Sequence, residues 1–578
     1  MFLMILFLAT GDSTVTDTSK TYEIPEIIHP YGETRPAGET TPDYYEYTAL
    51  DILKEFPVVP LAYGFGVMSK FMNKGRNPAY TRISLNGHPL NTQPFGYFSL
   101  GMLPFHTVEQ MSFGRTAAGA EFGSFDFESK INSYELPYSF VQFMFGSFES
   151  NTYGFDLTRG ITDNLGFYMS GSYHKTEGHR ENTDAEILSA YSNIYFNLFL
   201  PVRLDICYAN SDCGYPGSMS LPVEGRQKDE FFDVSTTIGF GKGMGTLYYE
   251  RQTMDYLDTL YDRTWSVQID HIGAISEQHD TLFDVMLDYG VNGFYTVLTG
   301  ETYLPGKLVG FDAWLLLEKW FGRGVIRAAG KLENVSDHDV FLLPRIEVGV
   351  KPLGAAMIYA ALSRDGRSPS DIETWAPFDT LNPFLTVKGF EFLRSEYCWC
   401  GEIGLRGKGF FLNLYRLSFT DYISVFVVDD YIGYGNLDAW ETNGLEGYLN
   451  LPVRMYNADS TASTEFAIGV SGNIVMNGDP VHYVSRHYAS GTISAKRETE
   501  RLGFGIALRG EYSGTRRDID GTEYPGYKIL SAAGFVKYMG LSCTLRLNNV
   551  LDAEYVYLRG YPMPPRNFDV SVKWEFWD

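Results

Sequence analysis

The five cysteines are the residues of this 578-residue chain whose chemistry depends most directly on their spacing. They are Cys207, Cys213, Cys398, Cys400 and Cys543, and they form neither a C-x-x-C pair nor a second cluster with metal-ligand spacing. A bend between Cys207 and Cys213 would bring their Cα atoms within the ~4.4–6.8 Å that a disulfide requires. We therefore predict a Cys207–Cys213 disulfide in an oxidising compartment, with Cys398 and Cys400 as competing partners and Cys543 free.

Motifs for catalysis or cofactor binding are absent from the sequence. The chain contains no G-x-S-x-G, H-E-x-x-H, G-x-x-x-x-G-K-[ST] or G-x-G-x-x-G, and its ten histidines do not cluster at ligand spacing. The formal net charge is −25, from 46 Lys and Arg against 71 Asp and Glu, which argues against a nucleic-acid partner. We predict a protein that is not an enzyme, uses no cofactor and holds no metal.

The elements that must position any functional side chain are β-strands. After about residue 133, apolar and polar residues alternate in many segments of about ten residues, which is typical of strands in an outer-membrane barrel. No apolar run approaches the ~18 residues of a spanning helix. In the clearest segment, which ends the chain, the apolar positions are Phe568, Val570, Val572, Trp574 and Phe576.

The connections between these segments alternate in length. Short ones at 162–164, 241–243, 352–354 and 407–409 alternate with long polar ones, as expected for periplasmic turns and outer loops. The long connections are 176–186, 211–230, 364–396, 421–437, 514–527 and 549–565. A soluble β-sandwich would also alternate, but the pattern continues to the end of the chain without a domain break.

We count eleven rising and eleven falling segments after residue 133, about 20 residues for each strand with its connection. The fold predicted is an all-β membrane protein, a 22-stranded antiparallel transmembrane β-barrel over residues 134–578 in the cell outer membrane. A lumen of that width needs a plug. Residues 12–133 are expected to form an N-terminal extension and a small α+β plug domain, with a helix at 49–56 and strands at 83–85 and 108–113. Residues 1–11, with the apolar run 2–9, are expected to be a signal peptide.

Short segments from residue 51 onward match motifs of one protein family in order and spacing. In the N-terminal region these are 51–58 (DILKEFPV), 83–91 (ISLNGHPLN) and 108–123 (VEQMSFGRTAAGAEFG). In the barrel they are 343–350 (LPRIEVGV), 362–370 (LSRDGRSPS), 402–405 (EIGL), 443–446 (NGLE), 547–555 (LNNVLDAEY) and 560–566 (GYPMPPR). Together they resemble the TonB-dependent outer-membrane receptors, and the resemblance covers most of the chain.

The chain departs from the family pattern in its N-terminal region. The glycine-rich segment that follows the family's Y-G is represented by 123–132 (GSFDFESKIN), and the family's I-R-G by Asn73, Lys74 and Gly75. The only candidate for a TonB box, the segment that the energy transducer binds, is 21–28 (TYEIPEII). These departures leave energy coupling open.

The resemblance implies a contact between plug and barrel. Arg115 occupies the family's plug arginine, and Lys74 is the remnant of a second. Glu402 and Glu446 belong to the barrel motifs, and alternation turns both side chains inward. We expect these four residues to form a plug–barrel latch; the alternative is separate solvated charges in a wet lumen.

The resemblance also places the ligand site at the apex of the plug, in 63–68 and 92–97. The aromatic and amide side chains there offer flat, partly polar contact surfaces. The alternative is that they only pack the plug against the barrel. The expected binding residues are Tyr63, Phe65, Gln93, Phe95 and Tyr97.

The leading functional hypothesis is a receptor that takes up a scarce bulky nutrient, such as a metal chelate, corrinoid, glycan or peptide, by TonB-coupled gating of the plug. Its partners would be a TonB-like periplasmic energy transducer, the nutrient ligand, outer-membrane lipids and the barrel-assembly machinery. The second hypothesis is a plugged barrel that has lost coupling and serves as a passive channel or a structural or adhesive protein. A barrel enzyme is a third class, but no motif nominates the Ser–His pair that it would need.

Overall fold

The structure is a computed structural model that describes most of the barrel and part of the N-terminal region. The described residues are 33–36, 57–62, 69–74, 76, 80–90, 98–104, 107–114, 124–130 and 137–577. Within the last range, gaps fall at 163, 198, 220, 261–262, 301–305, 337, 354–355, 371–372, 375–385, 408, 429–430, 457–461 and 478–481. No helix among the described residues is long and apolar enough to cross a membrane.

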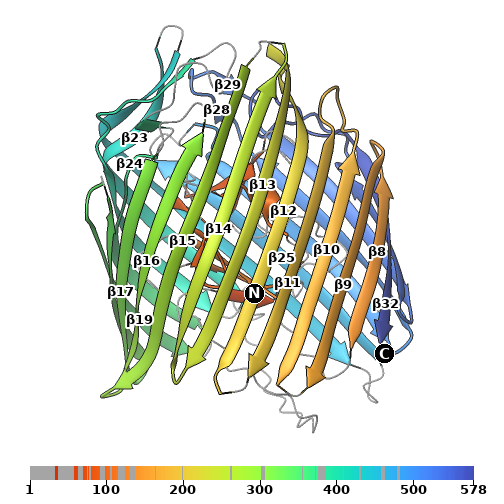
Figure 1. Ribbon diagram of the computed structural model, residues 1–578, viewed down its shortest axis with the longest axis horizontal. Helices are drawn as coiled ribbons and strands as arrows, with labels where there is room; N and C mark the ends of the chain where they lie inside the picture. Colours follow the sequence, from red (N-terminus) through yellow and green to blue (C-terminus); the bar gives the residue numbers. More distant parts are fainter. Residues whose placement is uncertain are drawn as a thin grey trace.

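Twenty-two antiparallel strands close into one barrel (Figure 1), which confirms the predicted fold. Each strand pairs with the next along the chain, and β32 pairs with β8 to complete the ring. Since every backbone edge is paired, no unsatisfied strand edge faces lipid. The strands are β8 (Tyr138–Gly146), β9 (Ser150–Thr162), β10 (Leu165–Thr176), β11 (Ala185–Asn197), β12 (Pro201–Ser218), β13 (Leu221–Phe240), β14 (Gly243–Asp258), β15 (Arg263–Leu282), β16 (Val285–Gly300), β17 (Gly306–Phe321), β18 (Gly324–Val335), β19 (Phe341–Leu353), β20 (Ala356–Arg367), β22 (Glu396–Gly407), β23 (Phe410–Val428), β24 (Tyr431–Tyr456), β25 (Ala462–Asn477), β26 (His487–Thr499), β27 (Leu502–Ser513), β30 (Tyr527–Tyr538), β31 (Leu541–Asn548) and β32 (Asn567–Trp577).

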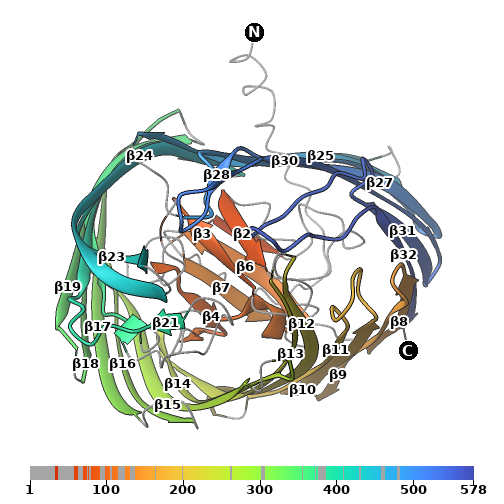
Figure 2. The same ribbon diagram turned by 90° about the horizontal axis from the view of Figure 1, so that it is seen from above.

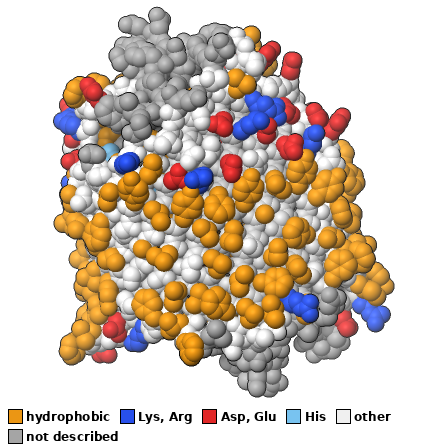
Figure 3. All heavy atoms as spheres, in the orientation of Figure 1, with side chains coloured by type: hydrophobic (Ala, Val, Ile, Leu, Met, Phe, Trp, Pro, Cys, Tyr) orange, Lys and Arg blue, Asp and Glu red, His pale blue; other side chains and the backbone are white. Residues whose placement is uncertain are grey.

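The outer wall carries the apolar half of the alternating pattern. A broad band of hydrophobic side chains covers the middle of the wall, and charged side chains gather above it (Figure 3). Ile403 and Ile506 on this band are 62% and 63% exposed, whereas their sequence neighbours Glu402 and Ala507 are 4% and 1% exposed. Period-two alternation therefore divides each strand into a lipid face and a lumen face.

The connections are short at one end of the barrel, as predicted. At the other end, two of the predicted long loops are absent. Only two residues separate β9 from β10, β13 from β14, β19 from β20 and β22 from β23, as expected for short connections. The predicted loops 211–230 and 421–437 are wrong, because β12 and β13, and likewise β23 and β24, remain paired almost to their tips. Beyond the membrane both faces of a hairpin meet water, so neither face needs apolar side chains. The apolar–polar alternation therefore ends there, although the backbone hydrogen bonds between the two strands continue.

Three further short strands lie among the barrel connections. The strand β21 (Thr386–Lys388) runs parallel to the outer part of β24. Between β27 and β30, β28 (Arg516–Arg517) pairs with β29 (Glu523–Tyr524) to form a small hairpin. These elements add structure to the same end of the barrel as the long hairpins.

A small domain fills the lumen of the ring when the barrel is viewed from above (Figure 2). Its five-stranded sheet has the order β1-β6-β7-β4-β5, and β2 and β3 form a separate hairpin. The expected strands at 83–85 and 108–113 are present, whereas the expected helix at 49–56 lies outside the described residues. The elements are β1 (Glu33–Pro36), β2 (Val58–Ala62), β3 (Ser69–Asn73), β4 (Ile83–Leu85), β5 (His88–Pro89), the 3-10 turn η2 (Leu100–Met102), β6 (Val108–Gly114) and β7 (Ser124–Ser129).

The plug shares a hydrophobic core with the barrel wall. Phe98, Phe125 and Phe127 of the plug, each at most 2% exposed, pack in one cluster with Tyr191 and Phe231 of the wall. The rings of Phe98 and Phe231 meet edge to face with centroids 5.2 Å apart. Apolar packing thus joins the plug to β10–β13, and two further clusters join it to β22–β23 and to β26.

Candidate functional site

The ion pairs between the described residues of plug and wall share one arrangement of charge, in which the plug supplies the basic group and the wall supplies the acid. The plug residues are Lys74, Arg76, Arg82, His88 and Lys130. Their acidic partners stand on lumen-facing positions of strands spread around the ring. The arrangement fixes the plug at several points of the wall rather than at one.

Lys74 forms a buried contact with two acids of the wall. It follows β3 directly and has a positive φ of 52°, which turns the chain toward β22 and β24. Its Nζ lies 2.7 Å from Glu402 Oε1 and 3.1 Å from Glu446 Oε1, and all three side chains are at most 5% exposed. Burial disfavours the charge of Lys74, but the two carboxylates outweigh it and raise the pKa of Lys74 above its usual value.

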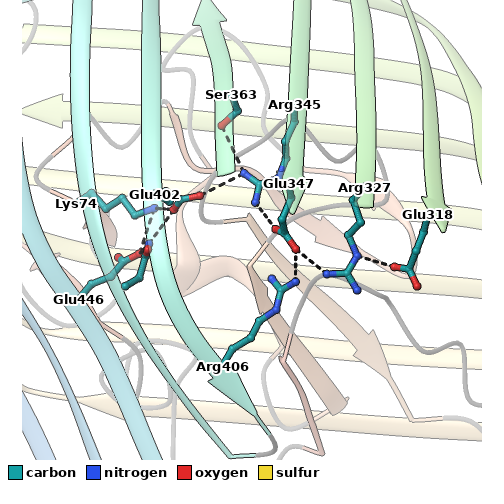
Figure 4. A network of polar contacts seen from close by, with 10 residues as sticks. Lys74, Glu318, Arg327, Arg345, Glu347, Ser363, Glu402, Arg406 and Glu446 are labelled. Atoms are coloured by element: carbon teal, nitrogen blue, oxygen red, sulfur yellow. Dashed lines mark hydrogen bonds and ion pairs between the residues drawn. The ribbon is translucent and has the colours of Figure 1, made fainter. Parts of the chain in front are cut away.

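The Lys74 contact continues along the wall as a chain of ion pairs (Figure 4). Arg345 on β19 contacts Glu402 at 3.2 Å and Glu347 at 2.6 Å. Glu347, which is 0% exposed, also accepts from Arg327 on β18 at 2.6 Å and from Arg406 on β22.

The chain ends on β17, where Glu318 lies 2.5 Å from Arg327. Asn413 on β23 donates to both Glu402 and Glu446, at 2.8 Å and 3.1 Å. The network thus joins the plug to β17, β18, β19, β22, β23 and β24, and its four cations balance its four carboxylates. We call this set the latch network: Lys74, Glu318, Arg327, Arg345, Glu347, Glu402, Arg406 and Glu446.

A second anchor lies on β17 and β18. Arg82 of the plug contacts Glu333 and lies 3.8 Å from Asp312. Lys331 bridges the same two carboxylates, at 2.8 Å from Glu333 and 3.5 Å from Asp312. This anchor and the latch network both rest on β17 and β18.

Two anchors on the opposite part of the wall hold β5 and the end of β7. His88 Nε2 lies 2.8 Å from Asp233 on β13, with both side chains 0% exposed, and the His88 ring stacks on Tyr248 at 5.0 Å. Lys130 Nζ lies 2.7 Å from Asp156 on β9. A plug held from both sides can leave only if several buried contacts break together.

Buried pairs of this kind act as positioning contacts more than as a net source of stability. Removing two charges from water costs about as much as their mutual attraction returns, so the intact pair is nearly neutral relative to apolar packing. Removing one partner costs about 3–5 kcal/mol because a buried charge is left uncompensated. The arrangement therefore favours one seated position strongly over any shifted one.

The structure brings together three of the four expected latch residues. Lys74, Glu402 and Glu446 are in contact, and Glu402 and Glu446 face inward while their neighbour Ile403 faces out. Arg115 lies outside the described residues, so its contact with these carboxylates stays a prediction, as does the role of the group as a latch. The expected apical residues Tyr63, Phe65, Gln93, Phe95 and Tyr97 also lie outside the described residues.

Sequence reasoning missed most of the latch network. Arg345 and Glu347 are two apart in the segment 343–350, and the outward residues Ile346 and Val348 mark the other face. From that alternation alone, the side chains of Arg345 and Glu347 could have been predicted to face the lumen. Arg82 and His88 carried no comparable signal, because short plug strands do not show which side meets the wall.

The predicted Cys207–Cys213 disulfide is wrong, since all five cysteines are free. Cys207 and Cys213 lie on the single strand β12, opposite Tyr191 and Ala185 of β11. Six residues of extended strand place the two Cα atoms roughly 20 Å apart, far beyond disulfide range. The disulfide prediction assumed that 211–230 is a loop that bends between the two cysteines. These residues belong instead to the β12–β13 hairpin, which is extended.

We expect a non-reduced digest of protein from its native membrane to contain five unpaired cysteines. Cys207, Cys398 and Cys400 are 0% exposed beneath the plug, whereas Cys543 lies on the lipid face. A water-soluble maleimide should therefore label the first three only after denaturation, read by mass spectrometry of each peptide. Detection of any cross-linked cysteine pair would contradict the structure.

Among the described residues, no group of three or more His, Cys, Asp or Glu side chains is arranged to hold a metal ion. The described contacts of the site are hydrogen bonds and ion pairs between the plug and the wall.

Comparison with known proteins gives one consistent result. The family described as "TonB dependent receptor-like, beta-barrel" matches residues 76–550. The chain is 24% identical over 585 residues to the vitamin B12 transporter BtuB of Vibrio vulnificus (strain YJ016), covering 92% of this chain and 90% of that protein.

Solved structures of similar shape cover nearly the whole chain. The siderophore receptor PirA from Acinetobacter baumannii has a TM-score of 0.72 at 12% identity, over 94% of this chain and 98% of that one. The copper transporter OprC has a TM-score of 0.73 at 14% identity, over 94% and 97%. At such identities the likeness shows the fold alone.

Proposed function

Since this chain belongs to the TonB-dependent receptor family, and is an outer-membrane receptor or transporter, we propose that it imports a scarce bulky nutrient by TonB-driven displacement of its plug. The observation that carries the proposal is the seated plug. Lys74, Arg82, His88 and Lys130 of the plug contact lumen-facing carboxylates on β9, β13, β17, β18, β22 and β24. A solute cannot pass a lumen filled in this way until those contacts are broken.

The geometry supports an active mechanism over free diffusion. Several buried ion pairs must separate together, and a ligand shifts that equilibrium only by the difference in its affinity for the two states. The free energy needed to break these ion pairs would come from an external force on the plug, because ligand binding alone does not supply it. The partner proposed for that pull is the periplasmic energy transducer TonB.

The cargo proposed is a metal chelate or corrinoid too large for an open porin, with a glycan or peptide as further classes. The similarity to a vitamin B12 transporter makes cyanocobalamin the first probe. Uptake of labelled cyanocobalamin by cells that depend on this protein, lost when TonB is removed, would support the corrinoid. Ferric chelates are tested in the same cells if cyanocobalamin is not taken up.

We predict that the full-length protein in detergent is retained by the immobilised periplasmic domain of TonB. The contact is expected at 21–28, by addition of an extended segment to a strand edge. Ile24→Pro removes a backbone donor there and should abolish retention, whereas Ile24→Val should preserve it.

The second candidate, a plugged barrel without energy coupling, is favoured by two sequence features. They are the loss of family glycines in 123–132 and the weak resemblance of 21–28 to a TonB box. Absence of retention for the unaltered protein, together with uptake that persists without TonB, would select this candidate.

A further inference from the structure

The loop between β31 and β32, residues 549–566, does not stay at the rim of the barrel. It runs inward from the wall toward β2 and the end of β12 (Figure 2). An antiparallel bridge between Val556 and Pro562 makes the loop double back on itself. We call residues 549–566 the strap.

The tip of the strap is fixed to the end of the β12–β13 hairpin, five strands further round the ring from β32. The backbone N–H of Met219, just past β12, donates to the carbonyl of Gly560 at 2.8 Å. The hydroxyls of Tyr561 and Tyr215 lie 2.9 Å apart, and His179 Nε2 lies 2.8 Å from the Pro562 carbonyl oxygen.

Gly560 is required for this close approach. Its φ is 82°, and a Cβ at this position would lie 2.6 Å from Ser218 Cβ. Any larger residue would strain the backbone and push the strap away from the β12–β13 hairpin.

The middle of the strap rests on the plug. Leu558, which is 4% exposed, packs in one cluster with Val59 and Met72 of the β2–β3 hairpin and with Val484 and Tyr488 near β26. Met72 lies two residues before Lys74, so the same plug hairpin touches both the strap and the latch network.

The third side of the mouth holds the strap through Arg516 and Arg559. Arg516, which is 3% exposed, donates to the Tyr557 carbonyl oxygen at 2.9 Å. Arg559 lies 2.9 Å from Asp520 and 3.3 Å from Asp518, but its side chain is 45% exposed, and such pairs contribute little. The buried contacts of Tyr557, Leu558 and Gly560 are the ones that keep the strap in place.

We propose that the strap is a cover over the plug, seated on the β2–β3 hairpin in this structure, which must swing off that hairpin before anything from outside reaches this face of the plug. The inference does not depend on TonB coupling or on the identity of the cargo, because it concerns access alone. It adds to the proposed import a step at the outer mouth, separate from release of the latch network.

The test uses Met72→Cys as a reporter in the full-length protein in right-side-out outer-membrane vesicles. Met72 is 3% exposed beneath the strap, so a membrane-impermeant maleimide should label Cys at this position slowly. Gly560→Val in the same background should raise the labelling rate by about tenfold or more, because it shifts the strap toward its open position. Tyr561→Ala, which removes the hydroxyl pair with Tyr215 without backbone strain, should raise it too.

Gly322→Val is the matched control. Gly322 also has a positive φ, 63°, but lies in a turn at the other end of the barrel with no atom within 4 Å of an added Cβ. It should leave the labelling rate unchanged. The native Cys398 and Cys400 report on the plug itself and should stay protected in every variant.

Three results would overturn the proposal. One is rapid labelling at position 72 with the unaltered strap. Another is a rate that neither Gly560→Val nor Tyr561→Ala increases. The third is parallel labelling of Cys398 and Cys400, since the plug would then be leaving instead of the strap opening.

Discussion

Lys74→Met will release the plug while leaving the barrel closed. The substitution keeps the length of the side chain and removes the cation shared by Glu402 and Glu446, at 2.7 Å and 3.1 Å. Asn413 and Arg345 still donate to this pair of acids, so we take the low end of the cost of an uncompensated buried charge, about 3 kcal/mol. That value corresponds to roughly a hundredfold increase in the population of unseated plug.

The native thiols measure this release. Cys398 and Cys400 pack in one cluster with Tyr80 of the plug and are 0% exposed. Their alkylation rate should rise by about two orders of magnitude in Lys74→Met, in line with the population of open protein. The temperature at which the barrel loses its compact mobility on SDS gels should not change.

Two further variants separate a latch from a general loss of charge. Lys537→Met removes the cation of the pair Lys537–Glu575, 2.5 Å apart on β30 and β32 and 35% exposed at the lysine. Surface pairs are worth about 0–1 kcal/mol, so this control should leave Cys398 and Cys400 protected. Adding Glu446→Gln alone to Lys74→Met should restore much of the protection, because Arg327, Arg345 and Arg406 then balance Glu318, Glu347 and Glu402. Equal labelling in Lys74→Met and the unaltered protein would refute the latch.

The parts of this molecule that the sequence made predictable are those governed by a local rule. Lipid on one side and lumen on the other impose a period of two on every strand, so the number of strands and the facing of Glu402 and Ile403 could be read residue by residue. This alternation is imposed only on the part of each strand that lies within the membrane. The β12–β13 hairpin continues past that point with polar side chains, and its paired backbone left no signal in the hydropathy.

The error over Cys207 and Cys213 shows the same limit. A stretch of polar residues with Gly214 and Pro216 is typical of a loop. In the structure both residues lie within β12, whose pairing with β13 shifts its register near Tyr215. Long-range pairing with β11 and β13 decided the local conformation, and sequence spacing carries no information about such pairing. The thiols were thereby fixed about 20 Å apart.

The candidate site was predictable in part. Motif resemblance nominated Lys74 and Glu446, and alternation turned Glu446 inward. The partners Arg345, Glu347 and Arg327 lie on strands that the motifs did not connect to the plug. Ion pairs between residues as far apart as Lys74 and Glu402 depend on the rotation of the plug within the ring, which a single sequence does not encode locally.

Glu347→Gln should weaken the wall itself, a different outcome from that of Lys74→Met. Glu347 is 0% exposed and accepts from Arg327, Arg345 and Arg406. Without its charge the latch network holds four cations against three carboxylates. The cost is again about 3–5 kcal/mol, because three guanidinium groups then face one another around a neutral amide.

The measurement is the rate at which the folded barrel converts to its unfolded form on heating in SDS, since barrels of this size unfold irreversibly and their stability is kinetic. We expect Glu347→Gln to unfold at least about tenfold faster at a fixed temperature, if part of the cost is already lost in the transition state. The matched control is Glu465→Gln, whose partner Arg454 lies 2.5 Å away and is 53% exposed, and this pair should change the rate little. Unchanged unfolding in Glu347→Gln would mean that water in the lumen reaches the three arginines and screens them. The latch network would then be a hydrated surface, in which a single missing charge does not unseat the plug.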